Sequence, residues 1–345
     1  MLGLKRSSKT KIAANRDTSK PAAATFVAKS AHLQGPGQLR VQNTQLQFRT
    51  ALRTTARLHA TQLSEINLYG RVTLTEGALA VIGKHQIDVA MFSKCGTRAR
   101  GRIIHNHDSA TRLRESQYRI AFDHGKTLDL AKSWVGQKIE SQIVAARYFQ
   151  QHGQTKRTSR RKSIVHQLAQ LKKQCVHANR IDVARGYEGA ASAVWYGFLG
   201  NQFPSPFDFQ KRTRRPPKDH ANALLSLGYT LLSRRIESLL RSKGLEVTIG
   251  SLHAQRSGRA SLACDLIEPL RIKLVDRFVL GMVNRKQVTG RDITVSKDGH
   301  RLTPDGYRLF LANWEQHYWS NYTAVSQTLG WYTSYLRGTG KTQAI

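Results

Sequence analysis

Cysteine and acidic residues are both scarce in this chain of 345 residues. The three cysteines, Cys95, Cys175 and Cys264, are widely spaced. Their odd number and their spacing exclude a disulfide framework and a structural zinc site. We therefore expect a protein of a reducing compartment, the cytoplasm.

Long apolar runs are also missing. The sequence has no run of about 18 apolar residues that could span a bilayer, and no basic helix with a strong aromatic face for a membrane surface. The N-terminal segment is basic and rich in serine, but it has no apolar core of signal-peptide length. A transit peptide and a basic arm are both open interpretations of this segment. Because long apolar runs are missing, we expect no membrane association of the protein.

Positive charge is what the chain has in excess. Its 55 Lys and Arg residues against 22 Asp and Glu give a formal net charge of +33. Self-repulsion on this scale favours a polyanionic partner. Nucleic acid is the most common such partner, because each phosphate that a protein neutralises releases bound counterions and so adds affinity. The composition therefore predicts a nucleic-acid-binding protein.

Apolar periodicity divides the chain into segments. Alternation predicts a hairpin with a turn at Asn43 and Thr44, and further short strands follow it. Thr75 is the predicted N-cap of one short helix. Later segments have a period near 3.6 and predict helices over residues 127–151, 163–176, 187–199, 221–242 and 261–282.

These patterns predict a fold of class α+β, in which a small β-sandwich-like N-terminal domain precedes a larger, all-helical C-terminal domain. The first segment carries seven Lys or Arg residues and one acid, with little apolar periodicity, and so predicts a disordered basic arm. The expected boundaries are an arm over 1–38, a β-rich domain over 39–107, a linker over 108–119, a helical domain over 120–337 and a tail over 338–345.

Two basic clusters interrupt the helical half. Residues 155–162, TKRTSRRK, hold five cations, and residues 211–217, KRTRRPP, hold four. A solvated loop is the plain interpretation of either cluster. Because the whole chain is so basic, we expect at least one of them to contact phosphates.

Four residues are candidates for chemistry. Glu188 lies in RGYEGAASAVWYG, His253 in TIGSLHAQRSG, and Asp265 and Glu268 in SLACDLIEPLR. Residues three apart share a helix face, so the last two carboxylates can point at one place. They repel each other there unless a cation or a proton relieves them. A hard divalent ion such as Mg²⁺ or Mn²⁺ would do so, and an added imidazole suits Mn²⁺.

Each of these residues also has a purely structural interpretation. The acid pair can lie at the surface, neutralised by Arg259 or Arg271. A histidine in such a segment is often a satisfied loop or core residue, and an acid in the first turn of a helix is favoured by the helix dipole. Spacing alone does not bring the four residues together.

Several motifs together resemble one known family, the spacer-acquisition integrase of CRISPR systems, CRISPR-associated protein one. They are RGYEGAASAVWY, RRPPKDHANALLSLGYTLL, IGSLHAQRSGRASLACDLIEPLR and, upstream, INLYGRVTLTEGALAVIGKHQIDVAMFSKCGTRARGRI. The similarity extends from about Leu39 to Arg337. It implies an N-terminal β-domain joined to a helical domain, as the periodicity also predicts.

The resemblance implies a metal site made of Glu188, His253 and Glu268, which match the EG, G-x-L-H and D-L-x-E motifs. Asp265 is then a second acid, either a reserve ligand for a second ion or a residue that supports the ligands. Asn222 and Tyr229 lie in a further shared motif, for which packing and a helix-stabilising hydrogen bond are the favoured interpretation. We expect Pro269 to bend or end the helix just past Glu268.

The implied function is that of a Mg²⁺- or Mn²⁺-dependent DNA endonuclease and integrase of antiviral defence. It would insert captured DNA fragments, the spacers, into a CRISPR array by transesterification from a 3′-hydroxyl. The implied partners are the double-stranded DNA of fragment and repeat, a second copy in a homodimer, and CRISPR-associated protein two. Two alternatives are open: a transposon-type integrase of the same superfamily, and a non-catalytic basic scaffold that binds nucleic acid.

Overall fold

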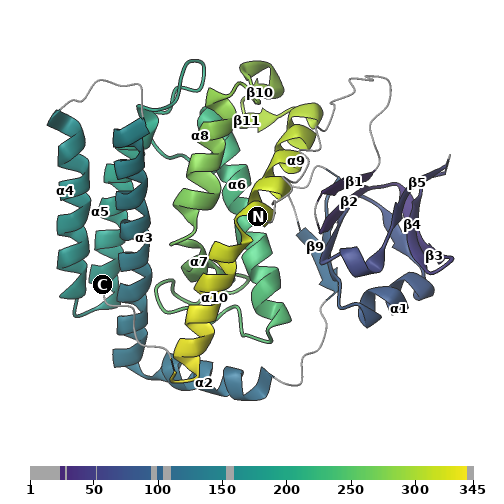
Figure 1. Ribbon diagram of the computed structural model, residues 1–345, viewed down its shortest axis with the longest axis horizontal. Coiled ribbons are helices and arrows are strands. Elements are labelled where there is room, and N and C mark those ends of the chain that lie inside the picture. Colours follow the sequence, from purple (N-terminus) through teal and green to yellow (C-terminus); the bar gives the residue numbers. More distant parts are fainter. Residues whose placement is uncertain are drawn as a thin grey trace, which may run out of the picture. The chain divides into compact units, whose positions relative to one another are not determined.

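The computed structural model describes residues 24–27, 29–51, 53–94, 99–103, 110–152 and 159–339. The chain divides into two compact units. Unit 1 is Met1–Phe26 with Ala31–Gly101, and unit 2 is Val27–Ser30 with Arg102–Ile345. Strands dominate the described part of unit 1 and helices that of unit 2 (Figure 1). The prediction of N-terminal strands followed by C-terminal helices is therefore confirmed.

The N-terminal strands form two sheets. The first has five strands in the order β1-β2-β6-β8-β9, with bounds Ala24–Val27, Ser30–Gln34, Glu65–Tyr69, Asp88–Phe92 and Ala99–Ile103. The second has four strands in the order β5-β4-β3-β7, with bounds Thr54–Leu58, Gln45–Arg49, Gly37–Gln42 and Val72–Leu74. A short turn of helix, η1 (Ala60–Gln62), and the helix α1 (Glu76–Lys84) lie between strands. Sandwich packing of the two sheets stays a prediction.

Two local predictions for this region are confirmed. Strands β3 and β4 pair antiparallel up to Gln42 and Gln45. The two residues between them, Asn43 and Thr44, have φ angles of 49° and 63°, as a two-residue turn that matches the strand twist requires. Helix α1 begins after Thr75, whose side chain accepts a hydrogen bond from the amide of Ala78.

The predicted arm over residues 1–38 is wrong in its second half. Residues 1–23 lie outside the described part of the chain, but β1, β2 and the start of β3 fall within the predicted arm. Ala31 and Leu33 on β2 are fully buried. Their burial stabilises an ordered strand, which the count of Lys and Arg residues did not register.

Four of the predicted helices of unit 2 extend further in the structure than predicted, the fifth is interrupted, and three described helices were not predicted. The bounds of the described helices are α2 Thr111–Phe122, α3 His124–His152, α4 Ser159–Val176, α5 Ile181–Gly200, α6 His220–Ser242, α7 Ser261–Ile267, α8 Arg277–Asn284, α9 Pro304–Ser320 and α10 Tyr322–Leu336. Figure 1 shows α3, α4 and α5 side by side, and all three pairs are in contact. In the described part of the chain, no helix is long and apolar enough to cross a membrane.

Two boundaries in this half need correction. Most of the predicted linker over 108–119 belongs to α2, because Gln117 packs inward and its amide donates to the carbonyl of Glu246, 2.8 Å away. The domain is also not all helical. After the turn η4 (Gly290–Asp292), strands β10 (Ile293–Ser296) and β11 (Gly299–Leu302) pair as an antiparallel hairpin.

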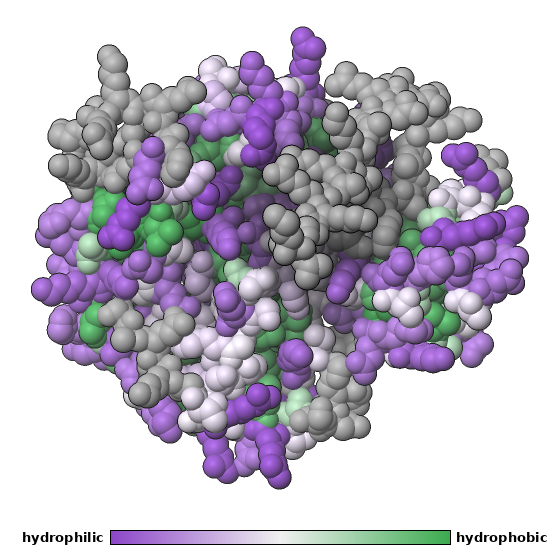
Figure 2. All heavy atoms as spheres, viewed as in Figure 1, coloured by the Kyte–Doolittle hydropathy of each residue, from purple (hydrophilic) through white to green (hydrophobic). Residues whose placement is uncertain are grey.

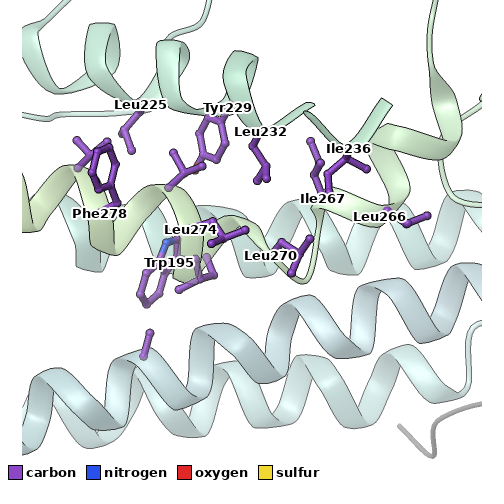
Figure 3. Packing of buried hydrophobic residues seen from close by; sticks show 14 of the residues in the cluster. Trp195, Leu225, Tyr229, Leu232, Ile236, Leu266, Ile267, Leu270, Leu274 and Phe278 are labelled. Atoms are coloured by element: carbon purple, nitrogen blue, oxygen red, sulfur yellow. The ribbon is translucent and has the colours of Figure 1, made fainter. Parts of the chain in front are cut away.

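One part of the core of unit 2 lies between α6 and the segment from α7 to α8. Figure 3 shows side chains of α6 that point toward this segment, among them Leu225, Leu232 and Ile236, which face Ile267, Leu274 and Phe278. Gly228 allows this close approach, because a Cβ there would come within 2.8 Å of Val275 Cγ1. The segment that carries the candidate acids is thus fixed by apolar packing along its length.

The predicted single helix over 261–282 is interrupted where Pro269 stands. Helix α7 ends at Ile267, and a π-helical turn, η3 (Ile272–Asp276), leads into α8. Proline has no amide hydrogen and its ring clashes with the preceding turn, so a regular helix cannot continue through it. The expectation for Pro269 is confirmed, and π-helical turns of this kind often accompany functional sites.

We expect Leu232→Ala to lower the free energy of unfolding by about 2–5 kcal/mol, because it leaves a cavity in this core. Leu232 is fully buried, whereas Leu309 on α9 is 38% exposed. Urea unfolding followed by far-UV circular dichroism measures the difference, with Leu309→Ala as the control. Equal losses in the two variants would contradict the assigned core.

Candidate active site

Two of the four predicted residues, Glu188 and Glu268, contact one lysine in unit 2, and a third, His253, lies beside Glu268. Glu188 is on α5, and Glu268 is the C-cap of α7. His253 belongs to the loop between α6 and α7. The lysine, Lys138, comes from α3. Segments far apart in the sequence therefore meet at this site.

Lys138 joins the two glutamates. Its Nζ forms an ion pair with Oε1 of Glu188 and a second one, at 2.6 Å, with Oε2 of Glu268. The side chains of Lys138 and Glu268 are each 3% exposed, and that of Glu188 is 23% exposed. Ser192, one turn along α5, donates a hydrogen bond to the same oxygen of Glu188. Two acids thus converge on a single buried cation.

Asp265 does not point at this cation. It is fully buried, and its carboxylate accepts hydrogen bonds from the backbone amides of Ser251, Leu252 and His253 at 2.6–3.0 Å. Nδ1 of the His253 ring lies 2.7 Å from the same carboxylate, and Nε2 lies 4.0 Å from Oε1 of Glu268. Asp265 therefore holds the histidine loop and orients the ring so that Nε2 faces Glu268.

The close seating of this loop depends on Gly250. A Cβ at that position would come within 2.9 Å of Asp265 Oδ2 and of the backbone of Ser261. Arg185, one turn before Glu188, donates from its Nε to the carbonyl of Leu252, 2.6 Å away. The histidine is thereby connected to the helix that carries Glu188.

A second cation, Arg271, contacts the other oxygen of Glu268. Its Nη1 donates to Glu268 Oε1 over 2.8 Å, and its guanidinium lies 4.3 Å from the ring centre of Tyr229. Tyr229 donates to the buried Asp276, which also accepts a 2.7 Å hydrogen bond from Trp195 Nε1. Burial raises the pKa of Asp276. This network positions the arginine, since a guanidinium stacks well on an aromatic face.

The two cations keep Glu268 ionised. Burial by itself raises the pKa of a carboxyl group. Arg271 and Lys138 outweigh this effect and lower the pKa of Glu268 from 4.5 to about 2. At neutral pH the buried carboxylate is therefore charged, as a metal ligand must be.

The site has the donor types of a divalent-cation site, but its side chains surround an ammonium group here. In the described ranges, no group of three or more His, Cys, Asp or Glu side chains is gathered closely enough to hold a metal ion. Glu268 Oε2 is nevertheless buried without a hydrogen bond of good geometry, even though Lys138 Nζ is 2.6 Å away. Two carboxylates and an imidazole nitrogen form a donor set that Mn²⁺ and Mg²⁺ accept.

Sequence reasoning missed Lys138, although a signal for it exists. The residue shares a helix face with Trp134, Val135 and Gln142, all of them buried. Lysine is almost never fully buried unless it is paired. A lysine on the apolar face of a long helix therefore indicates buried acids on a neighbouring element.

The basic segment 211–217 is fixed to the start of α6 by Asn222. This fully buried side chain accepts from the amide of Thr213 and from Arg212, and donates to the carbonyl of Lys211. These contacts match the structural interpretation of Asn222. Arg214 and Arg215 in the same segment are exposed. Of the other predicted cluster, residues 155–158 and the side chains of 159–162 lie outside the described part.

The architecture and the site together define a class: a strand-rich unit followed by a helical unit in which two glutamates, a histidine and a lysine meet. The family model described as "CRISPR associated protein Cas1" matches residues 31–316. The chain belongs to this Cas1 family, as the motifs predicted.

Individual relatives agree with this assignment. The chain is 32% identical over 266 residues to "CRISPR-associated endonuclease Cas1 2" of Rhodospirillum rubrum. The aligned residues make up 74% of this chain and 75% of that protein. A solved CAS1 protein from Thermotoga maritima has a TM-score of 0.76 and 25% identity, over 90% of this chain and 97% of that one. A chain of a Cas6-RT-Cas1–Cas2 complex, 23% identical with a TM-score of 0.71, shares the fold over 93% of this chain and 36% of its own length.

We expect Asp265→Asn to destabilise the protein by about 3 kcal/mol, because an amide group would face backbone amide donors that now meet a carboxylate. Chemical denaturation measures this loss. The control is Asp305→Asn, since the side chain of Asp305 is 88% exposed and pairs with a neighbour on its own helix, Arg308. The free energy of unfolding of Asp305→Asn should fall by no more than about 1 kcal/mol. A loss of that size for Asp265→Asn as well would contradict its role in holding the loop.

Proposed function

We propose that the protein is a divalent-metal-dependent DNA endonuclease and integrase. It would insert captured DNA fragments into a CRISPR array by attack of a fragment's 3′-hydroxyl on the target phosphodiester. One observation carries this proposal: Glu188 and Glu268 converge on one buried positive charge, and Nε2 of His253 lies 4.0 Å from Glu268. Membership of a family whose relatives are named endonucleases supports it.

Glu188, Glu268 and His253 are the residues that would hold Mg²⁺ or Mn²⁺. Such an ion, when bound, polarises the attacked phosphate and stabilises charge on the attacking or leaving oxygen. Asp265 would keep His253 in the tautomer whose Nε2 is free to bind, through the contact with Nδ1. Arg271 would partly neutralise the charge of Glu268 through its contact with Oε1.

The same proposal requires surfaces for DNA and for partner proteins. Figure 2 shows hydrophilic side chains over most of the described surface on the face it presents. The net charge of +33 supports binding to phosphates through that surface. Because one structural neighbour is a complex of Cas1 and Cas2, we propose CRISPR-associated protein two as a partner, together with a second copy of this chain.

Within this proposal, segment 211–217 is a phosphate-binding surface. Asn222 fixes its backbone, so that little conformational entropy is lost when Arg214 and Arg215 meet a phosphate. Arg212 of the same segment lies 5.3 Å from the ring centre of Tyr229, on which Arg271 also stacks. A series of contacts, from Arg212 through Tyr229 to Arg271, therefore connects this segment to the candidate active site.

We expect Glu188→Gln and His253→Ala each to lower strand transfer by at least about 100-fold, while DNA affinity stays within about threefold of the wild type. The assay follows insertion of a fluorescent DNA fragment into a repeat-containing target, with Mn²⁺ and the partner protein present. His177→Ala, at an exposed position, is the control. Full activity of His253→Ala would refute the site. Strand transfer without any need for the repeat would favour the transposon-type alternative.

DNA affinity should fall steeply with salt. Between 50 and 300 mM salt we expect a linear loss of log affinity against log salt concentration, with a slope of roughly −0.9 per phosphate contacted. The double variant Arg214→Ala with Arg215→Ala should reduce this slope by about 2. Fluorescence anisotropy measures it. Arg119→Ala is the control, because Arg119 is exposed but paired with Glu115. An unchanged slope in the double variant would remove segment 211–217 from the DNA surface.

A further inference from the structure

Lys138 lies where a metal ion would be expected. Its Nζ is ion-paired with both Glu188 and Glu268. The same two carboxylates are proposed above as metal ligands. A divalent ion that binds both of them must therefore take the place of the ammonium group or share the space with it.

Charge decides between these outcomes. Glu188, Glu268, Lys138 and Arg271 together are neutral when all are ionised. A divalent ion added beside both cations would leave two uncompensated positive charges in a largely buried site, and one if Lys138 withdrew. Repulsion between charges this close amounts to several kcal/mol even at an effective dielectric constant of about 20. Exchange is therefore favoured over sharing.

The site also determines which cation can leave. Arg271 is held by Glu268, by the face of Tyr229 at 4.3 Å and by Tyr196 OH at 3.5 Å. Lys138 has a flexible four-carbon stem. The carboxylate of Glu188 beside it is 23% exposed, so solvent is close to this end of the site. Lys138 is thus the cation that can move.

We propose that Lys138 is a built-in counter-ion, which holds Glu188 and Glu268 together in the metal-free protein and is displaced from between them when a divalent ion binds. This inference rests on the proposed function, because it takes the two glutamates as metal ligands. The inference adds Lys138 to that site. The lysine weakens metal binding and stabilises the metal-free fold.

The first test is the affinity of the full-length protein for Mn²⁺, measured by isothermal titration calorimetry without DNA. We expect Lys138→Met to lower the Kd for Mn²⁺ by at least about tenfold, since the charge that competes with the ion is gone. Lys138→Arg, which keeps the charge, should stay within about threefold of the wild type. Lys172→Met is the matched control, because it removes a lysine from an ion pair with Glu140 outside the site.

An unchanged or higher Kd for Lys138→Met would overturn the inference, because it would make the lysine a support for the metal site and not a competitor. Should this variant not fold, Lys138→Gln is measured in its place, with the same expected direction.

Crystal structures of the wild-type protein with and without Mn²⁺ provide a second test that needs no variant. Lys138 Nζ should lie more than 4 Å from at least one of the two carboxylates once the ion is bound. A lysine that still bridges both beside a bound ion would also overturn the inference, while leaving the proposed function intact. Strand transfer in the wild type without any Mn²⁺ binding would refute both.

Discussion

The buried charge of Glu268 is the constraint on which the helical unit depends. A carboxylate that is 2% exposed is stable only when cations neutralise it. Lys138 supplies one cation from α3, and Arg271 supplies the other from the segment after Pro269. The lysine also pairs with Glu188 on α5, so three helical segments are joined through these buried charges.

Several of the scarce acidic residues of this chain lie where they meet buried cations or hydrogen-bond donors. In the part of the chain that the structure describes, four acids, Asp265, Glu268, Asp276 and Glu315, are at most 2% exposed. Glu315, for example, accepts two hydrogen bonds from the buried Arg235. Acids used inside the protein cannot neutralise its surface. The outer surface is thus left with few acids, which strengthens the case for a polyanionic partner.

Much of the fold follows from local sequence. Asn43 and Thr44 formed the expected turn, Thr75 capped the expected helix, and Pro269 ended one. The errors arose where distant contacts outweigh local pattern. The strand at 30–34 lies in a segment that reads as a basic arm, yet Leu33 is fully buried. Helix α2 covers residues taken for a linker, because Gln117 finds partners more than 100 positions away.

For the site, the sequence by itself determined the residue types: two glutamates, a histidine and a nearby acid, recognisable through family motifs. Only the tertiary structure decided their roles. Asp265 and Glu268 share a short stretch of chain and look equivalent, but one turns to the histidine loop and the other to Lys138. The physical reason is that a buried carboxylate takes its role from the donors around it. The donors here come from elsewhere in the chain, Lys138 of α3 among them, and are brought close only by folding.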